Sequence, residues 1–154
     1  MFSSSSLKLM SSTEASASMD SWDKLIRFIE LTANHFLGTS GKQGYKLKLA
    51  CEEILSNIIR ETNSGKNKHQ CAAIKLNCYL LSTEDNDWLM LEIQDNGPHF
   101  DPDIEAQREI QRDQPLHERK EGGLGLFLVQ QSVDHLQYLF LHNWNTYRLW
   151  MRIS

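Results

Sequence analysis

The sequence predicts an α+β protein, a two-layer sandwich with helices on one face of a mixed, largely antiparallel β-sheet. Two stretches with the apolar spacing of helices come first, and two stretches of alternating apolar and polar residues follow. A third helical stretch then precedes two more alternating stretches. At 154 residues the chain is long enough to bury a core without disulfides or metal ions. We therefore expect a single domain over residues 20–154.

The first half of the chain should hold two helices after a weakly structured terminus. Residues 1–19 are rich in serine, which is typical of a loose terminus, although residues 7–10 could add an edge strand. The first helix is expected after Ser21, a residue type that favours the N-cap, and before Gly38. The second helix should span residues 43–62, where apolar residues recur on one face.

Four strands and a third helix are expected in the second half. Each strand alternates apolar with polar residues, and polar or Asn-containing loops separate the members of each hairpin. The third helix follows a run of glycines and should span residues 124–133. In chain order, the expected strands are residues 74–80, 88–93, 136–141 and 147–153.

Composition narrows the class of protein. The formal net charge of −4 and the pI near 5.8 argue against general attraction to nucleic acid or anionic membranes. The three cysteines form no CxxC pair, which fits a reducing compartment. No apolar run approaches the ~20 residues that span a bilayer, and the first residues lack a signal-peptide pattern. We therefore expect a cytoplasmic protein that binds neither nucleic acid nor membranes.

The second helix carries the first group of candidate site residues. At 100° per residue, Glu53, Asn57 and Arg60 fall within a stripe about 60° wide beside the apolar face. A carboxylate, an amide and a guanidinium therefore line up at the rim of the core. The stripe could be an ordinary polar flank of a buried helix. Asparagine is a poor helix former, however, so its presence in the middle of the helix suggests a functional role.

The second candidate group follows the second strand. Asp95 stands at the strand end and Gly97 follows two residues later, within the sequence DNGPHFDP. The pattern is compatible with a plain turn. It is also compatible with a carboxylate that the sheet holds at the mouth of a pocket, where it accepts a hydrogen bond from a ligand amine.

The third group is a glycine-rich run that leads into the third helix. Gly122, Gly123 and Gly125 remove side chains where a ligand could approach the backbone, and a helix N-terminus favours an anion such as phosphate. Arg119 and Lys120 precede them, either as solvated cations or as partners of phosphate. Residues 101–121 hold eleven charged side chains and are expected to form a solvated, mobile loop of the kind that serves as a lid.

These three groups, in this order, resemble the boxes of the GHKL superfamily, the ATP-binding domain of histidine kinases and gyrase. The resemblance covers residues 20–153. Residues 53–60 are similar to its N box, residues 95–102 to its first glycine box and residues 121–129 to its second. It implies the Bergerat ATP-binding fold. The DNGPHFDP and GGLGLFLVQQSVD stretches look most like the stand-alone anti-sigma-factor serine/threonine kinases of partner-switching systems.

The resemblance implies a role for each matched residue. Asn57 would hold Mg²⁺ through its side-chain oxygen, and Glu53 would be the catalytic base toward a substrate hydroxyl. Asp95 would accept a hydrogen bond from the adenine amine, and residues 103–120 would be the ATP lid. The residues implied to bind ATP are Asn57, Arg60, Asp95, Gly97, Phe100, Arg119, Lys120, Gly122, Gly123, Leu124 and Gly125.

The implied function is an ATP- and Mg²⁺-dependent protein serine/threonine kinase. It would phosphorylate a STAS-type anti-anti-sigma protein and sequester a sigma factor or similar target, and the resemblance suggests a homodimer. Two alternatives stay open: a nucleotide-gated binding protein without kinase turnover, and the detached catalytic domain of a split histidine kinase. The sequence departs from the serine kinases at residues 60–62, Arg-Glu-Thr where a His-containing segment is usual, and at His99, where a small residue or proline is common.

Overall fold

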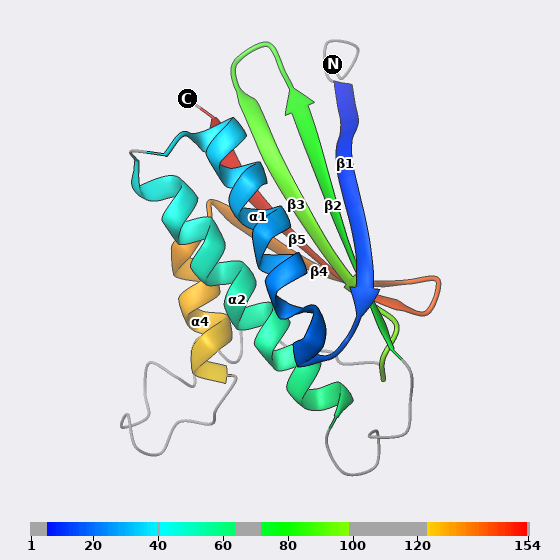
Figure 1. Cartoon of the computed structure of the whole chain (residues 1–154). Helices are drawn as coiled ribbons and strands as arrows, with labels where there is room; N and C mark the ends of the chain where they lie inside the picture. Colours follow the sequence, from blue (N-terminus) through cyan, green and yellow to red (C-terminus); the bar gives the residue numbers. More distant parts are fainter. Residues whose placement is uncertain (1–5, 40, 64–71, 99–122, 154) are drawn as a thin grey trace.

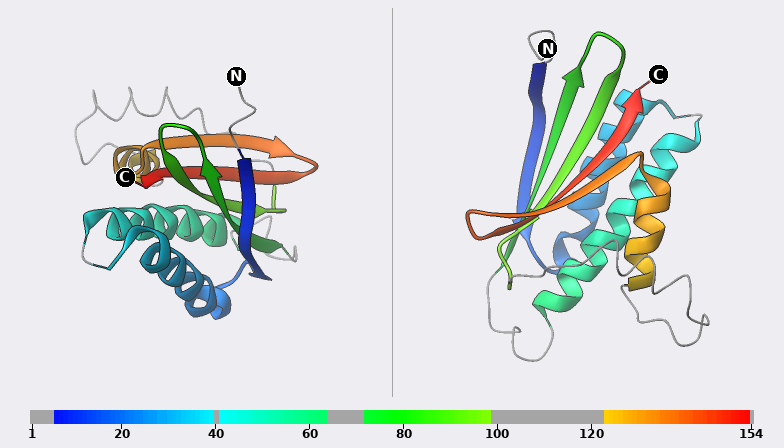
Figure 2. Two further views of the ribbon diagram at one scale, coloured as in Figure 1. Left: turned by 90° about the horizontal axis from the view of Figure 1, so that it is seen from above. Right: turned by 180° about the vertical axis from the view of Figure 1, so that it is seen from behind.

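The computed structural model describes residues 6–39, 41–63, 72–98 and 123–153. Within these ranges, three helices lie together on one face of a five-stranded sheet (Figures 1 and 2). A single 3₁₀ turn precedes the first helix at Met19–Ser21. In chain order the elements are β1 (Ser6–Ser16), α1 (Trp22–Leu37), α2 (Lys42–Thr62), β2 (Ala73–Ser82), β3 (Asp87–Asp95), α4 (Gly123–Ser132), β4 (His135–Leu141) and β5 (Trp144–Ile153).

The sheet has the strand order β1-β2-β3-β5-β4. All four pairings among the described strands are antiparallel, so the expected α+β sandwich is confirmed, with an antiparallel rather than a mixed sheet. β3 is the central strand, and its last residue, Asp95, pairs with Asn145 near the start of β5. The chain therefore leaves β3 at the end of the sheet where β5 begins, whereas β4, which follows α4, begins opposite Trp150 farther along β5.

The expectation of a loose N-terminus is wrong for residues 6–16, whereas the edge strand considered for residues 7–10 is confirmed and is longer than expected. They form an edge strand that pairs with β2 along its whole length, with one bulge between Leu9 and Ser11. The serine-rich composition did not reveal the full length of this strand, because the strand is stabilised by backbone pairing rather than by burial of its own side chains. Leu7 and Leu9, for example, remain 53% and 52% exposed.

The core lies between the helices and the inner face of the sheet. α2 is the middle helix and packs against both α1 and α4. Alternation along β3 directs Leu89, Leu91 and Ile93 into the core. The largest fully buried side chains come from all these elements: Leu25, Ile29, Leu47, Ile54, Leu55, Ile74, Leu76, Leu89, Leu91, Ile93, Val129 and Leu149.

Helix boundaries agree with expectation to within one residue, but two details differ. Ser21 does precede α1, yet its side chain makes no capping bond; it is buried and shares a hydrogen bond of 2.9 Å with the Ser16 hydroxyl. α4 begins at Gly123, one residue before the expected start, so Gly123 belongs to the helix rather than to the preceding loop. No helix in the described ranges has the length and apolar character to cross a membrane.

Candidate functional site

Three of the predicted site segments meet at one end of the molecule. The C-terminal half of α2, the end of β3 and the start of α4 all lie at the lower end in Figure 1, and Figure 2 shows the same arrangement from behind. Gly97, two residues after β3, lies close to α2, because a Cβ added to it would be 3.3 Å from Thr62 Oγ1 in the last turn of that helix. The fold therefore places the Asp95 segment beside the helix that carries Glu53 and Asn57.

Asp95 is a buried carboxylate at the centre of this end. It occupies the next core-facing position after Ile93 on β3, and only 4% of the residue is exposed. The backbone N–H of Gly97 and the side-chain amide of Asn145 donate to its Oδ1 over 3.0 and 3.1 Å. Within the described residues both bonds fall on Oδ1, so Oδ2 is available to a ligand.

Burial raises the pKa of Asp95 above the ordinary value of a carboxyl group. The hydrogen bonds from Asn145 and from the Gly97 backbone act in the opposite direction, because they favour the charged form. The protein thus removes the Asp95 carboxylate from water, and the two hydrogen bonds offset part of the cost of burying its charge. That environment strengthens a further hydrogen bond from a ligand amine, because little water competes for it.

Sequence reasoning missed Asn145 as part of this site and assigned it to a hairpin loop. The structure places it on β5, 1% exposed, with its side chain against Asp95. A signal was present: the core-facing alternation of Tyr147, Leu149 and Met151 extends back to Asn145. An amide at a core position implies a hydrogen-bond partner.

Glycine is needed at position 97 because the Asp95 carboxylate lies close to its backbone, and not because its φ angle is positive. A Cβ at this position would lie 3.0 Å from Asp95 Oδ1, a distance that forces the carboxylate to shift. We expect Gly97→Ala to weaken ATP binding roughly fivefold to tenfold, because the shift misaligns the hydrogen bond from the ligand amine. Titration calorimetry with ATP measures this effect.

Gly41→Ala is the matched control, since nothing lies within 4 Å of a Cβ there. Equal ATP affinity in the two variants would show that the contact between Gly97 and Asp95 does not matter for the ligand.

The flank of α2 carries the other group of candidate residues. Glu53 and Asn57 are half-buried and Arg60 is exposed. One helical turn separates Glu53 from Asn57, so their side chains are neighbours on the helix surface. Arg60 Nη2 donates a hydrogen bond to Asn57 Oδ1. Glu53 has no hydrogen bond or ion pair with another described residue, which leaves its carboxylate available.

Several predicted ligands of ATP cannot be placed. Phe100, Arg119, Lys120 and Gly122 lie outside the described residues, as does the segment 103–120 expected to form the lid. Gly123, Leu124 and Gly125 form the first turn of α4, beside α2. The backbone N–H groups of a first helical turn have no acceptor within the helix, so they can bind an anion.

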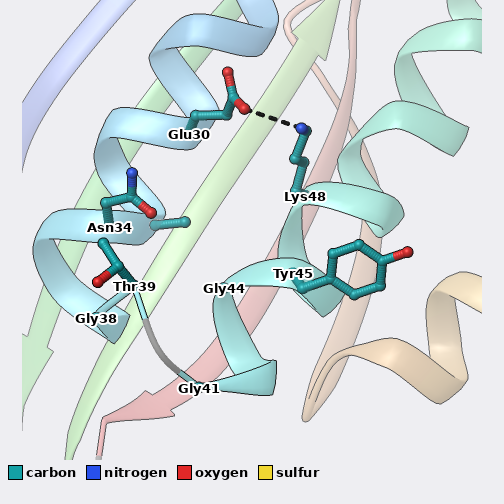
Figure 3. A pocket seen from close by; sticks show the side chains of 9 residues that line it. Glu30, Asn34, Gly38, Thr39, Gly41, Gly44, Tyr45 and Lys48 are labelled. Atoms are coloured by element: carbon teal, nitrogen blue, oxygen red, sulfur yellow. Dashed lines mark hydrogen bonds and ion pairs between the residues drawn. The ribbon is translucent and has the colours of Figure 1, made fainter.

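A surface hollow of about 180 Å³ lies elsewhere, between the end of α1 and the start of α2 (Figure 3). Glu30 and Lys48 face each other across it and form an ion pair of 2.9 Å. Gln43, next to the hollow, hydrogen-bonds the backbone of Arg152 at the far end of β5 from Asn145. The hollow is therefore remote from Asp95 and shares no residue with the candidate site.

Comparison with known families agrees with this geometry. A family model described as the histidine kinase-like ATPase domain matches residues 15–152, which include every described residue of the candidate site. The chain therefore belongs to the histidine kinase-like ATPase domain family. Domains of this type bind ATP, usually together with Mg²⁺. No curated protein matches the chain with significant similarity.

Proposed function

We propose that this protein is an ATP- and Mg²⁺-dependent protein serine/threonine kinase of the anti-sigma type. The flank of α2 carries this proposal. Glu53 offers a half-buried carboxylate one turn before Asn57 and bonds to no other described residue. A carboxylate in that position can accept the proton of a substrate hydroxyl while the hydroxyl oxygen attacks the phosphate. A protein that only bound nucleotide would have no need of such a base.

The described residues fit an adenine nucleotide. Asp95 Oδ2 is an acceptor in a buried setting, which suits the amino group of adenine, and Gly97 leaves room for the base. Asn57 supplies the hard oxygen that Mg²⁺ prefers. Mg²⁺, when bound, neutralises charge on the phosphate oxygens. Arg60, which donates to Asn57 Oδ1, would then donate to a phosphate oxygen instead.

The start of α4 suits the phosphates. Gly123, Leu124 and Gly125 present first-turn N–H groups at the positive end of the helix dipole. Arg119 and Lys120 are close in sequence and would add charge-assisted hydrogen bonds. This assignment gives the glycine-rich run the role of cradling the triphosphate.

The proposed partners follow from the sequence likeness to partner-switching kinases. The substrate would be a serine or threonine of a STAS-type anti-anti-sigma protein, and the sequestered target a sigma factor or a similar protein. We also propose a homodimer in the cytoplasm. The DNGPHFDP and GGLGLFLVQQSVD stretches support these assignments.

Transfer of radiolabelled phosphate tests the proposal. The purified protein is incubated with γ-labelled ATP, Mg²⁺ and a lysate of the cells from which the sequence comes, with an EDTA-treated reaction as the control. One acid-stable phosphoprotein that depends on Mg²⁺ is expected, and mass spectrometry then identifies it. Acid-labile label would indicate histidine phosphorylation instead. ATP binding with no labelled protein would favour a nucleotide-gated binding protein.

A further inference from the structure

Asp95 belongs to a chain of hydrogen-bonded side chains, buried at Asp95 and Asn145 and half-buried at Tyr138, that no motif in the sequence describes. Tyr138 on β4 donates its hydroxyl hydrogen to Asn145 Oδ1 over 2.5 Å. Asn145 Nδ2 donates to Asp95 Oδ1 over 3.1 Å and to the backbone oxygen of Pro98 over 2.9 Å. Tyr138 reaches Asn145 as a diagonal neighbour, because its direct partner across the strand pair is Tyr147. Three strands, β3, β5 and β4, are therefore linked through one amide.

The partners of Asn145 leave its amide only one orientation. Asp95 Oδ1 and the Pro98 oxygen are both acceptors, so the NH₂ group must face them. Turning the amide by 180° would place its oxygen against a carboxylate and a carbonyl, which repels. Because the amide oxygen can only accept, the Tyr138 hydroxyl must donate to it. Tyr138 thus secures the orientation in which Asn145 donates to Asp95.

The orientation of Asn145 decides which oxygen of Asp95 meets a ligand. Asn145 and the Gly97 N–H both bind Oδ1, which keeps that oxygen inside the protein. Oδ2 is then the acceptor presented to the ligand. Without the Asn145 amide, the carboxylate would be held by the Gly97 N–H alone among its described partners, and it could rotate.

We propose that Asn145, oriented by Tyr138, is a positioning residue that makes this site select purines with a 6-amino group. Asn145 does not touch the ligand; it acts through Asp95. The inference rests on the proposed nucleotide site, in which Asp95 Oδ2 accepts a hydrogen bond from the adenine amine. It predicts that losing Asn145 removes the contribution of that amine and leaves the rest of nucleotide binding in place.

The test compares two ligands, ATP and the purine riboside triphosphate that lacks the 6-amino group. Dissociation constants are measured by calorimetry with Mg²⁺ for the wild type, Asn145→Leu and Tyr138→Phe. The matched controls are Asn77→Leu and Tyr79→Phe, because both residues lie on the opposite face of the sheet, where Asn77 bonds to Glu92. Thermal unfolding of each variant shows that it is folded.

The ratio of the two dissociation constants is the decisive quantity. The wild type should prefer ATP by about tenfold or more, as expected for a hydrogen bond to a charged acceptor. Asn145→Leu should bring the ratio to within about threefold of unity, and Tyr138→Phe should lower it by at least about threefold. Both controls should keep the wild-type ratio.

A purely structural role for Asn145 would weaken both ligands equally and leave the ratio unchanged, which would overturn the inference. If Asn145→Leu does not fold, an unchanged ratio in Tyr138→Phe has the same consequence. A wild type that does not distinguish the two ligands would instead overturn the assignment of Asp95 to the adenine amine, so the two failures are separable.

Discussion

Replacing Glu53 by alanine is expected to reduce phosphate transfer by about 10²- to 10⁴-fold, the usual contribution of a positioned general base. ATP binding should change little, because Glu53 is assigned to the substrate hydroxyl and not to the nucleotide. The residue makes no hydrogen bond with another described residue, so the fold should tolerate its loss. Initial rates of labelling at saturating Mg-ATP, together with calorimetry for ATP, measure the two effects separately.

Glu52→Ala is the matched control for this experiment. Glu52 is also half-buried on α2, but it lies near Lys48, with 4.0 Å between the charged atoms. A half-exposed ion pair of that length contributes little to stability, so Glu52→Ala should retain both transfer and binding. Transfer that survives in Glu53→Ala would show that Glu53 is not the base. Loss of transfer in both variants would point to a general effect on α2.

Replacing Asp95 by asparagine is expected to weaken ATP binding by about 1 to 3 kcal/mol, or roughly 5- to 150-fold. The reason lies in the two donors on Oδ1. An asparagine would keep its oxygen toward the Gly97 N–H and the Asn145 amide, and it would turn its own NH₂ toward the ligand. That NH₂ then meets the adenine amine, donor against donor. A 6-oxo purine nucleotide such as ITP offers an acceptor there and should lose less affinity.

Asp87→Asn is the matched control, since Asp87 is exposed at the opposite end of β3. Calorimetry with ATP and ITP gives the comparison. Equal affinities of wild type and Asp95→Asn for ATP would remove Asp95 from the adenine site. A parallel loss for both nucleotides would indicate a collapsed pocket rather than an exchanged donor.

The pH dependence of binding gives a second measure of Asp95. Burial raises its pKa, and the ligand amine needs the ionised form as acceptor. ATP affinity should therefore be full above this raised pKa and should fall as the pH drops through it. Tyr147 on β5, whose charge would act on Asp95, stays neutral in this range, because burial raises its pKa further above the ordinary value of a tyrosine. The variant Asp95→Asn should lack this acid limb.

Much of the fold could be predicted because it depends on local periodicity. The helical spacing from residue 43 to 62 and the alternation on both sides of residues 82–87 define elements whose bounds agree with the structure to within two residues. Asp95 is a related case, because its place at the end of an alternating strand already marks it as the last core-facing residue. The flank of α2 was predictable for the same reason, since 100° per residue determines which side chains share a face.

The choice of which strands pair is not a local property of the sequence. It explains why the full β1 strand and the role of Asn145 were not predicted. The Ser-rich β1 becomes a strand because β2 offers it a row of backbone donors and acceptors. The sequence of residues 6–16 does not indicate which strand will pair with it. Asn145 lies fifty positions from Asp95 in the chain, and only the register between β3 and β5 brings the two side chains together.

The sequence by itself determined the helices, the alternating strands and the choice of candidate site residues, because these depend on side-chain chemistry and on spacing along one segment. Only the tertiary structure decided that the sheet is antiparallel throughout, that residues 6–16 form its edge, and that Tyr138 and Asn145 hold Asp95 by one oxygen. Those features arise from hydrogen bonds between segments far apart in the chain. Such bonds form once the folded core has excluded water from polar groups that must then find partners.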